Sequence, residues 1–126
     1  IFGKCKKSNL YISDPVDYQN QPTFFNQVLQ FKLPQMTSLE VLNTFKSIEK
    51  KIGRTKTIPK GPRIIDIDLL FFGHDELNHI DLVIPHPRIF ERSFVVLPLR
   101  ELPSFSYLSQ KFSFSNNFNN TAEVYN

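Results

Sequence analysis

The chain has 126 residues, of which 40% are hydrophobic and 21% charged, a balance typical of one small globular domain with a single core. Its single cysteine, Cys5, excludes an internal disulfide framework and a cysteine-based metal site, and no segment has the length of a membrane span. The formal net charge of +3 fits a small anionic ligand as well as nucleic acid, because the cations are not gathered into one run. A reducing, cytoplasmic setting is expected.

The first part of the sequence predicts two strands joined by a polar loop. Residues 1–12 read as β-structure whose lysines are typical of an exposed edge strand. Residues 13–23 are polar, contain two prolines and predict a loop that is long for a small domain. Residues 24–33 predict one continuous second strand, with four apolar residues on one face: Phe25, Leu29, Phe31 and Leu33.

Phe24 and Asn26 form a distinctive pair at the start of that second strand. They are two residues apart, so a strand places both on the same face. A flat ring beside an amide with a donor and an acceptor could stack on a planar heterocycle and read its edge. The alternative is that Phe24 belongs to a small core and that Asn26 caps the loop.

The clearest predicted element is a helix over residues 34–52. Thr37 and Glu40 have the spacing of a capping box, and Gly53 is a typical C-terminal stop. Apolar residues recur on one helical face: Val41, Leu42, Phe45, Ile48 and Ile52. Glu49 lies at the edge of this stripe, either as a surface residue or as one that reaches a ligand at the helix end.

Two carboxylates follow in a segment predicted as a central strand, residues 61–73. Asp66 and Asp68 point to the same side of such a strand, about 6–7 Å apart, opposite an apolar face. Two Mg²⁺ ions about 4 Å apart, clamping a phosphate chain, suit this spacing. The alternative is an exposed strand face that carries two acids.

Cations come directly before the two carboxylates. Residues 54–60 predict a basic loop with Arg54, Lys56 and Lys60, and Arg63 follows it. Arg63 could hold phosphate oxygens in a fork, while metal takes other oxygens, which is what a triphosphate site needs. The loop is also unremarkable as a plain surface segment.

The second half of the sequence predicts short elements. Residues 77 and 82–84 suggest brief strands, and His86 between two prolines suits hydrogen bonding to phosphate better than metal binding, because no partner ligand lies at the right spacing. Residues 88–102 predict helical turns broken near Pro98, with Phe90, Phe94, Leu97 and Leu102 inward. Residues 103–126 predict an irregular, partly ordered tail, and no Walker phosphate loop occurs.

Three of these segments together resemble the 6-hydroxymethyl-7,8-dihydropterin pyrophosphokinase family of folate biosynthesis: residues 61–70 (GPRIIDIDLL), 84–88 (IPHPR) and 91–99 (ERSFVVLPL). The likeness runs from about Leu10 to Leu102. It implies an α/β (α+β) fold, a ferredoxin-like α/β sandwich with a mostly antiparallel sheet, as one domain over residues 1–126 with a core from about 8 to 102. It also implies that ATP gives its β,γ-diphosphate to the hydroxymethyl group of a reduced pterin, releasing AMP.

The resemblance further implies a role for each matching residue. Catalytic roles fall to Arg54, Arg63, Arg92 and His86. Contacts to ATP, the co-substrate, fall to Glu49, Arg54, Lys56, Arg63, Leu69, Leu82, Val83, His86 and Arg92. Contacts to the pterin fall to Ser13, Phe24, Asn26, Phe94 and Asp66. Two Mg²⁺ ions are implied as the cofactor, held by Asp66 and Asp68.

The chain departs from the family at its start, where the family has a strand and a helix that this sequence lacks. We therefore expect an N-terminally truncated sequence, and a truncated, catalytically inactive nucleotide- or pterin-binding domain is the alternative function. An RNA-binding domain that stacks bases on Phe24 is a second alternative, but Asp66 and Asp68 would repel an RNA backbone, so no nucleic-acid partner is expected. We expect a monomer with no membrane partner. Fusion to other folate enzymes and closure of the 54–60 loop over ATP stay open.

Overall fold

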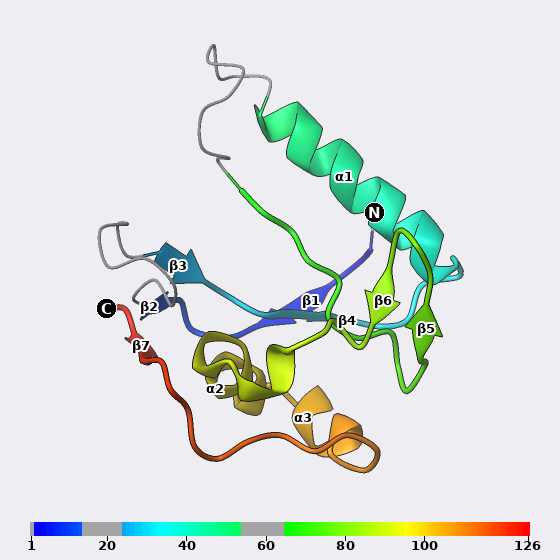
Figure 1. Cartoon of the computed structure of the whole chain (residues 1–126). Coiled ribbons are helices and arrows are strands. Elements are labelled where there is room, and N and C mark those ends of the chain that lie inside the picture. Colours follow the sequence, from blue (N-terminus) through cyan, green and yellow to red (C-terminus); the bar gives the residue numbers. More distant parts are fainter. Residues whose placement is uncertain (1, 14–23, 54–64) are drawn as a thin grey trace. The chain divides into compact units, whose positions relative to one another are not determined.

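The computed structural model describes residues 2–13, 24–53 and 65–126. The chain divides into two compact units (Figure 1): the first holds Ile1–Lys32 and Pro87–Asn126, and the second holds Leu33–His86. Within the described residues all paired strands are antiparallel, and helices accompany them in both units. This mixture confirms the α+β class. The loop predicted at 54–60 lies outside the described residues, as do Arg54, Lys56, Lys60 and Arg63. Of the loop predicted at 13–23, residues 14–23 also lie outside, and Ser13 ends a strand.

The described residues of the first unit form two small sheets. One pairs β1 (Cys5–Lys7) with β4 (Leu29–Phe31), and β1 exposes its side chains as expected of an edge strand. The other has β2 (Tyr11–Ser13) in the middle, with β3 (Phe24–Asn26) on one side and β7 (Ala122–Val124) on the other.

The prediction of one continuous strand over residues 24–33 is wrong, because the chain leaves one sheet and enters the other at Gln27 and Val28. Ser8 lies opposite this break. Its N–H donates to the Val28 carbonyl at 3.0 Å, and its hydroxyl accepts from the Val28 N–H at 3.0 Å. Gln27 Nε2 donates to the Ser8 carbonyl at 2.7 Å. The Ser8 side chain therefore replaces part of the strand ladder. The two segments that meet here, around Ser8 and around Val28, both pass from one sheet to the other at this point.

In its described residues, the first unit also has three short helices: η1 (Ile89–Glu91), α2 (Ser93–Arg100) and α3 (Ser104–Leu108). The predicted break at Pro98 is wrong, because Pro98 lies inside α2. Proline removes one N–H donor, but α2 ends two residues later and the ring is fully buried, so little of the helix depends on the lost bond.

The buried core of the first unit is centred on α2. Val96 is fully buried and Leu99 is 3% exposed, and they are joined by Ile89, Val95, Leu102 and Leu108. Of the residues predicted to point inward, Leu102 is buried, whereas Phe90, Phe94 and Leu97 are half-buried. The helical stripe was therefore placed slightly off the true inward face.

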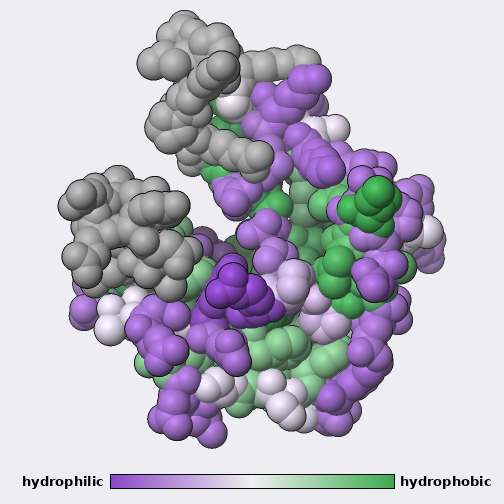
Figure 2. All heavy atoms as spheres, viewed as in Figure 1, coloured by the Kyte–Doolittle hydropathy of each residue, from purple (hydrophilic) through white to green (hydrophobic). Residues whose placement is uncertain are grey.

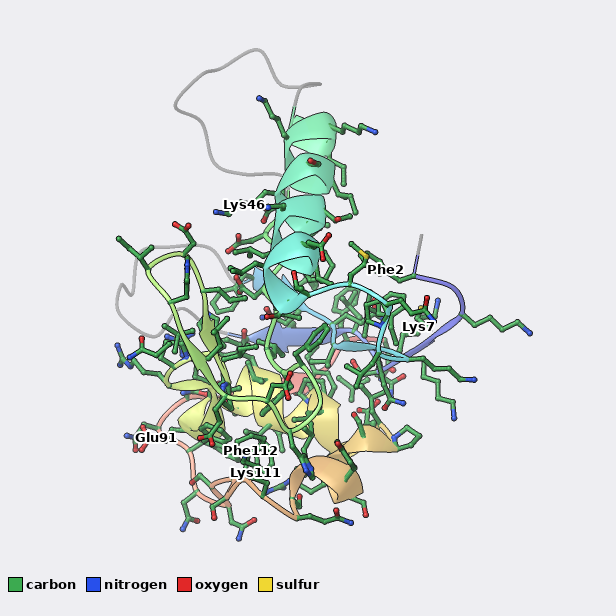
Figure 3. The ribbon with its side chains drawn as sticks, turned by 90° about the vertical axis from the view of Figure 1, so that its right-hand side faces the viewer. Phe2, Lys7, Lys46, Glu91, Lys111 and Phe112 are labelled. Carbon is green, nitrogen blue, oxygen red and sulfur yellow. The ribbon has the colours of Figure 1, made fainter. Side chains whose placement is uncertain are left out.

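The prediction of an irregular tail from residue 103 is wrong in two places, since α3 and β7 both form there. Aromatic packing explains part of the difference. The Phe114 ring lies 5.2 Å from that of Phe90 and 5.0 Å from that of Phe105, and Phe112 lies 5.9 Å from Phe90. Figure 3 shows Phe112 beside Lys111, just after α3. The scattered phenylalanines thus give the segment a place to pack.

The second unit consists of α1 (Ser38–Gly53), β5 (Leu77–Asn78), β6 (Val83–Ile84) and extended chain. The capping box is confirmed: the Thr37 N–H donates to Glu40 Oε1 at 2.9 Å, and the Glu40 N–H donates to Thr37 Oγ1 at 3.2 Å. Figure 2 shows hydrophobic colour over β5 and β6, where Ile80 in their connecting turn is 94% exposed. No helix in the described part of the chain is long and apolar enough to cross a membrane.

The predicted central strand at 61–73 is not confirmed, because residues 65–71 have no strand ladder, a bend and a turn follow at residues 72–74, and residues 61–64 are not described. Its backbone bonds go elsewhere. The Ile67 N–H donates to a side chain, Glu49 Oε2, and the Leu70 carbonyl accepts from the His86 N–H at 2.9 Å. The apolar alternation predicts a strand, but pairing depends on a neighbouring strand that the pattern does not reveal.

Candidate active site

The described candidate residues fall into two groups, one in each unit. The first unit holds Arg92 and four of the five residues that the resemblance assigns to the pterin, all but Asp66: these are Ser13, Phe24, Asn26, Arg92 and Phe94, called here the aromatic–amide cluster. The second unit holds Glu49, Asp66, Asp68, Leu69, Leu82, Val83 and His86. Each group is built by local structure of its own unit.

The pairing of β2 with β3 builds the polar part of the aromatic–amide cluster. Ser13 is paired with Phe24, and Tyr11 with Asn26, so all four side chains lie on the same face of the sheet. Ser13 is buried, and its Oγ lies 3.5 Å from Asn26 Nδ2, the outer limit of a hydrogen bond. The hydroxyl thus helps to orient an amide whose other polar atoms remain available to a ligand edge.

Helix α2 brings the second ring of the cluster to the first. The Phe24 and Phe94 ring centroids are 5.4 Å apart with an interplanar angle of 81°, an edge-to-face contact. Arg92 Cζ lies 5.7 Å from the Phe94 ring centroid, within the range of a cation–π interaction. A flat ligand between two parallel rings needs about 7 Å between the ring planes, so the rings must turn and part before one enters.

Two groups that sequence reasoning missed support this cluster. The Tyr11 hydroxyl donates to Glu101 Oε2, and the Asn9 N–H donates to Glu101 Oε1 at 2.8 Å. Burial, together with the adjacent Glu101, raises the pKa of Tyr11 to about 12. The bonds from the Asn9 backbone and from Tyr11 lower the pKa of Glu101. Asn120, in the C-terminal segment, accepts a hydrogen bond from the Ser93 N–H at the start of α2. No local sequence pattern predicts the contacts of Glu101 or of Asn120.

In the second unit, Glu49 is tied to the segment that carries the two aspartates. Its Oε2 accepts a 2.7 Å hydrogen bond from the Ile67 N–H, the peptide nitrogen between Asp66 and Asp68. Glu49 is half-buried, while both aspartates are exposed. The carboxylate group of Glu49 in α1 therefore lies beside the backbone of the Asp-x-Asp segment.

The remaining candidates of the second unit flank this segment. His86 is fixed by its backbone bond to Leu70. Leu82 is buried, and its N–H and carbonyl are both bonded to His79, at 3.2 and 2.9 Å, so its backbone groups are already satisfied within the turn. Val83 is 39% exposed in β6, and Leu69 is half-buried. Of these residues, Val83 presents the most surface to a ligand.

Comparison with known proteins gives a consistent result. Residues 2–104 match the sequence model of the family described as 7,8-dihydro-6-hydroxymethylpterin-pyrophosphokinase (HPPK). The chain is 45% identical over 100 residues to folic acid synthesis protein fol1 of Pneumocystis carinii, which covers 77% of this chain and 13% of that protein.

Two further relatives cover the same region. A 2-amino-4-hydroxy-6-hydroxymethyldihydropteridine pyrophosphokinase from Bacillus subtilis (strain 168) is 38% identical over 97 residues, 77% of this chain and 58% of that protein. A mitochondrial folate synthesis bifunctional protein of Arabidopsis thaliana is 39% identical over 102 residues, 79% of this chain and 18% of that protein. The chain spans less than two thirds of the length of each of these relatives, and its residues 105–126 lie beyond the match to the family.

Proposed function

Because the chain belongs to the 7,8-dihydro-6-hydroxymethylpterin-pyrophosphokinase family, we propose that it transfers the β,γ-diphosphate of ATP to the hydroxymethyl group of 6-hydroxymethyl-7,8-dihydropterin, releasing AMP, in folate biosynthesis. The observation that carries the proposal is the aromatic–amide cluster. Its members come from β2, β3 and the start of α2, far apart in the sequence. They nevertheless lie close together, as a shared ligand site requires.

The cluster supplies what recognition of a pterin requires. Phe24 and Phe94 offer flat apolar faces for stacking, and Asn26 offers a donor and an acceptor for the edge of the heterocycle. The pterin enters when the two rings part, and Asp66 is proposed as a further pterin contact from the second unit. Specificity follows from the amide, because an analogue that cannot pair with it leaves buried polar groups unsatisfied.

Asp66 and Asp68 fit the magnesium that this reaction needs. They offer hard oxygen ligands, they are exposed, and they alternate along extended backbone. Magnesium is commonly held by one or two carboxylates together with substrate phosphates, so the site does not require the cluster of three or more ligands that is absent from the described residues. When bound, two Mg²⁺ ions would neutralise charge on the triphosphate.

Other residues are proposed to hold ATP. Arg92 and His86 bind phosphate oxygens, as do Arg54, Lys56 and Arg63 outside the described residues, and the nucleotide is contacted by Glu49, Leu69, Leu82 and Val83. The pterin hydroxyl oxygen attacks the β-phosphorus in line and forms a new O–P bond. The bond from the β-phosphorus to the oxygen it shares with the α-phosphorus breaks, AMP leaves with that oxygen, and the hydroxyl proton passes to solvent. Positioning and charge neutralisation supply the catalysis.

The test is Mg²⁺-dependent AMP release by the chain and by two variants, Asp66→Asn and Asp68→Asn. Each variant is expected to lose about 100-fold or more of the parent's rate, since a carboxamide cannot neutralise a cation. Pterin binding, followed by pterin fluorescence, is expected to persist in Asp68→Asn. Near-normal turnover in both variants would contradict the metal assignment, and a parent that binds neither substrate would contradict the function.

A second candidate function is binding without catalysis. A parent chain that binds ATP and pterin in calorimetry but releases no AMP would select this alternative.

We propose a cytoplasmic monomer that is coupled to, or fused with, other folate enzymes. The plant relative is named a bifunctional protein, which supports the fusion. It is also named mitochondrial, which counts against a cytoplasmic location. Light scattering of the purified chain tests the monomer, and a fluorescent fusion tests the compartment.

A further inference from the structure

Helix α2 begins without a capping side chain of its own. Its N-cap residue is Arg92, in extended conformation and with no side-chain cap hydrogen bond. The first N–H groups of a helix have no partner within the helix, and Ser, Thr, Asp or Asn at the N-cap normally supplies one. Arginine has donors only and cannot accept these bonds. The start of α2 therefore needs an acceptor from elsewhere in the chain.

Asn120 supplies that acceptor from the C-terminal segment. Its Oδ1 accepts a 2.9 Å hydrogen bond from the Ser93 N–H, at the first residue of α2, and also accepts from the Ser93 hydroxyl. Ser93 is 1% exposed, so neither bond is readily replaced by water. One amide oxygen thus satisfies two buried donors at the start of the helix.

The segment that carries Asn120 is held on both sides of it. Before it, the Ser115 N–H donates to the Phe90 carbonyl at 3.0 Å, and Arg100 donates to the Ser115 carbonyl at 3.1 Å and to Asn116 Oδ1 at 2.8 Å. After it, β7 pairs with β2. We call residues 112–124 the C-terminal strap. Figure 1 shows the strap, orange to red, running past α2 to β7.

The strap meets the aromatic–amide cluster at two points. Ser93 is flanked by Arg92 and Phe94, two members of the cluster, and Ala122 of β7 is paired with Ser13, a third member. The strap also lies beyond the region that matches the family, residues 2–104. Its contacts therefore bear directly on the residues assigned to ligands.

We propose that Asn120 is a positioning residue for the ligand cluster: by capping α2 from the strap, it fixes Phe94 and frees Arg92 to face the substrate. This inference rests on the proposed function. A guanidinium at a helix N-terminus suits an anionic phosphate but is poorly placed against the helix dipole. An Asn or Ser at position 92 would cap the helix and lose the guanidinium. A cap delivered from the strap keeps both the capped helix and the Arg92 guanidinium. The usual N-cap residue is thus missing at a functional site, and Asn120 compensates for it.

The experiment compares Asn120→Ala with Asn120→Asp in the full chain. The dissociation constant for 6-hydroxymethyl-7,8-dihydropterin, measured by fluorescence with a non-hydrolysable ATP analogue present, is expected to rise about fivefold in Asn120→Ala. Asn120→Asp is expected to restore the parent value, because a carboxylate accepts the same bonds and is favoured at a helix N-terminus. Asn119→Ala, which removes an exposed amide one residue away, is the matched control.

The outcomes are distinguishable from failure of the proposed function. A parent chain that binds no pterin refutes both proposals, whereas a parent that binds and an Asn120→Ala variant with the parent's dissociation constant refute this one alone. If Asn120→Ala does not fold, Asn120→Leu keeps the volume without the acceptor, and the parent's affinity there also overturns the inference. If the cap were merely structural, Asn120→Ala would lower the unfolding temperature but leave the dissociation constant of the folded protein unchanged. Asn120→Asp would then have no loss of affinity to restore.

Discussion

Tyr11 and Glu101 give the first unit a pH dependence that belongs to single residues. The pKa of Tyr11 is raised from 10.0 to about 12, first by burial and then by Glu101, so the folded state favours the neutral phenol. This contribution to stability is fully present below pH 10 and is lost as the pH rises from about 10 to about 12. The pKa of Glu101 is lowered from 4.5, so its contribution is present above pH 4.5 and is lost as the pH falls through the folded value.

Tyr11→Phe is therefore expected to lower the free energy of unfolding by about 1–2 kcal/mol at neutral pH, the loss of a hydrogen bond to a charged group. The difference between variant and parent should shrink between pH 10 and pH 12, because the parent then loses the same interaction. Guanidinium unfolding at several pH values measures it. The comparison with the parent cancels the titration of lysines, and a difference that stays constant through pH 12 would contradict the assignment.

The residue scale also shows what the sequence could and could not reveal. The prediction that Phe24 and Asn26 share one face of a strand is confirmed, because alternation along a strand is a local property. Ser13 and Phe94 joined them through the resemblance, since nothing local links positions so distant. Neither local pattern nor the resemblance predicts the role of Asn120. Its contact with Ser93 spans 27 residues, and it lies in an Asn-rich stretch that is typical of an irregular tail.

At the scale of elements, α1 was predictable and the Asp-x-Asp segment was not. A helix satisfies its own backbone, so the capping box and the apolar stripe identified it. An extended segment needs a partner, and its alternation could not show that Ile67 is bound by a helix side chain instead of a strand. Partner choice is decided by tertiary contacts, and that limits prediction of elements.

The Glu49 bond to Ile67 yields a prediction at this scale. Glu49→Ala removes the acceptor, so amide hydrogen exchange at Ile67 is expected to speed up about tenfold, the equivalent of a modest hydrogen bond. Glu49→Gln keeps an oxygen acceptor at the same place and should retain most of the protection. Exchange followed by NMR reports this without any substrate. Equal rates in all three proteins would show that Glu49 does not hold the segment.

On the scale of the whole molecule, the first unit is assembled from both ends of the sequence. Its three-stranded sheet is formed by β2 and β3 from the N-terminal part of the sequence and β7 from the C-terminal part. Composition shows that the chain is rich in phenylalanine, but it could not show that the late phenylalanines pack against earlier ones. The C-terminal strap is consequently part of the fold that supports the aromatic–amide cluster.

Phe114 tests this role of the late phenylalanines because it contacts two earlier rings, Phe90 and Phe105. Phe114→Ala is expected to lower the free energy of unfolding of the first unit by about 2 kcal/mol, below the cost at a fully buried site because Phe114 is half-buried. Phe25→Ala is the matched control: it removes the same ring from a side chain that is 52% exposed, so it should cost clearly less.

The readout is native-state amide exchange, because it separates regions of a protein that open independently. Phe114→Ala should lower protection at Ser115, whose N–H donates to Phe90, and at Val95 and Val96 in α2. Loss of protection confined to residues 112–124 would mean that the strap opens without affecting the helix. In that case the strap would be an appendage, and the positioning of Arg92 and Phe94 would have to come from the core of α2 alone.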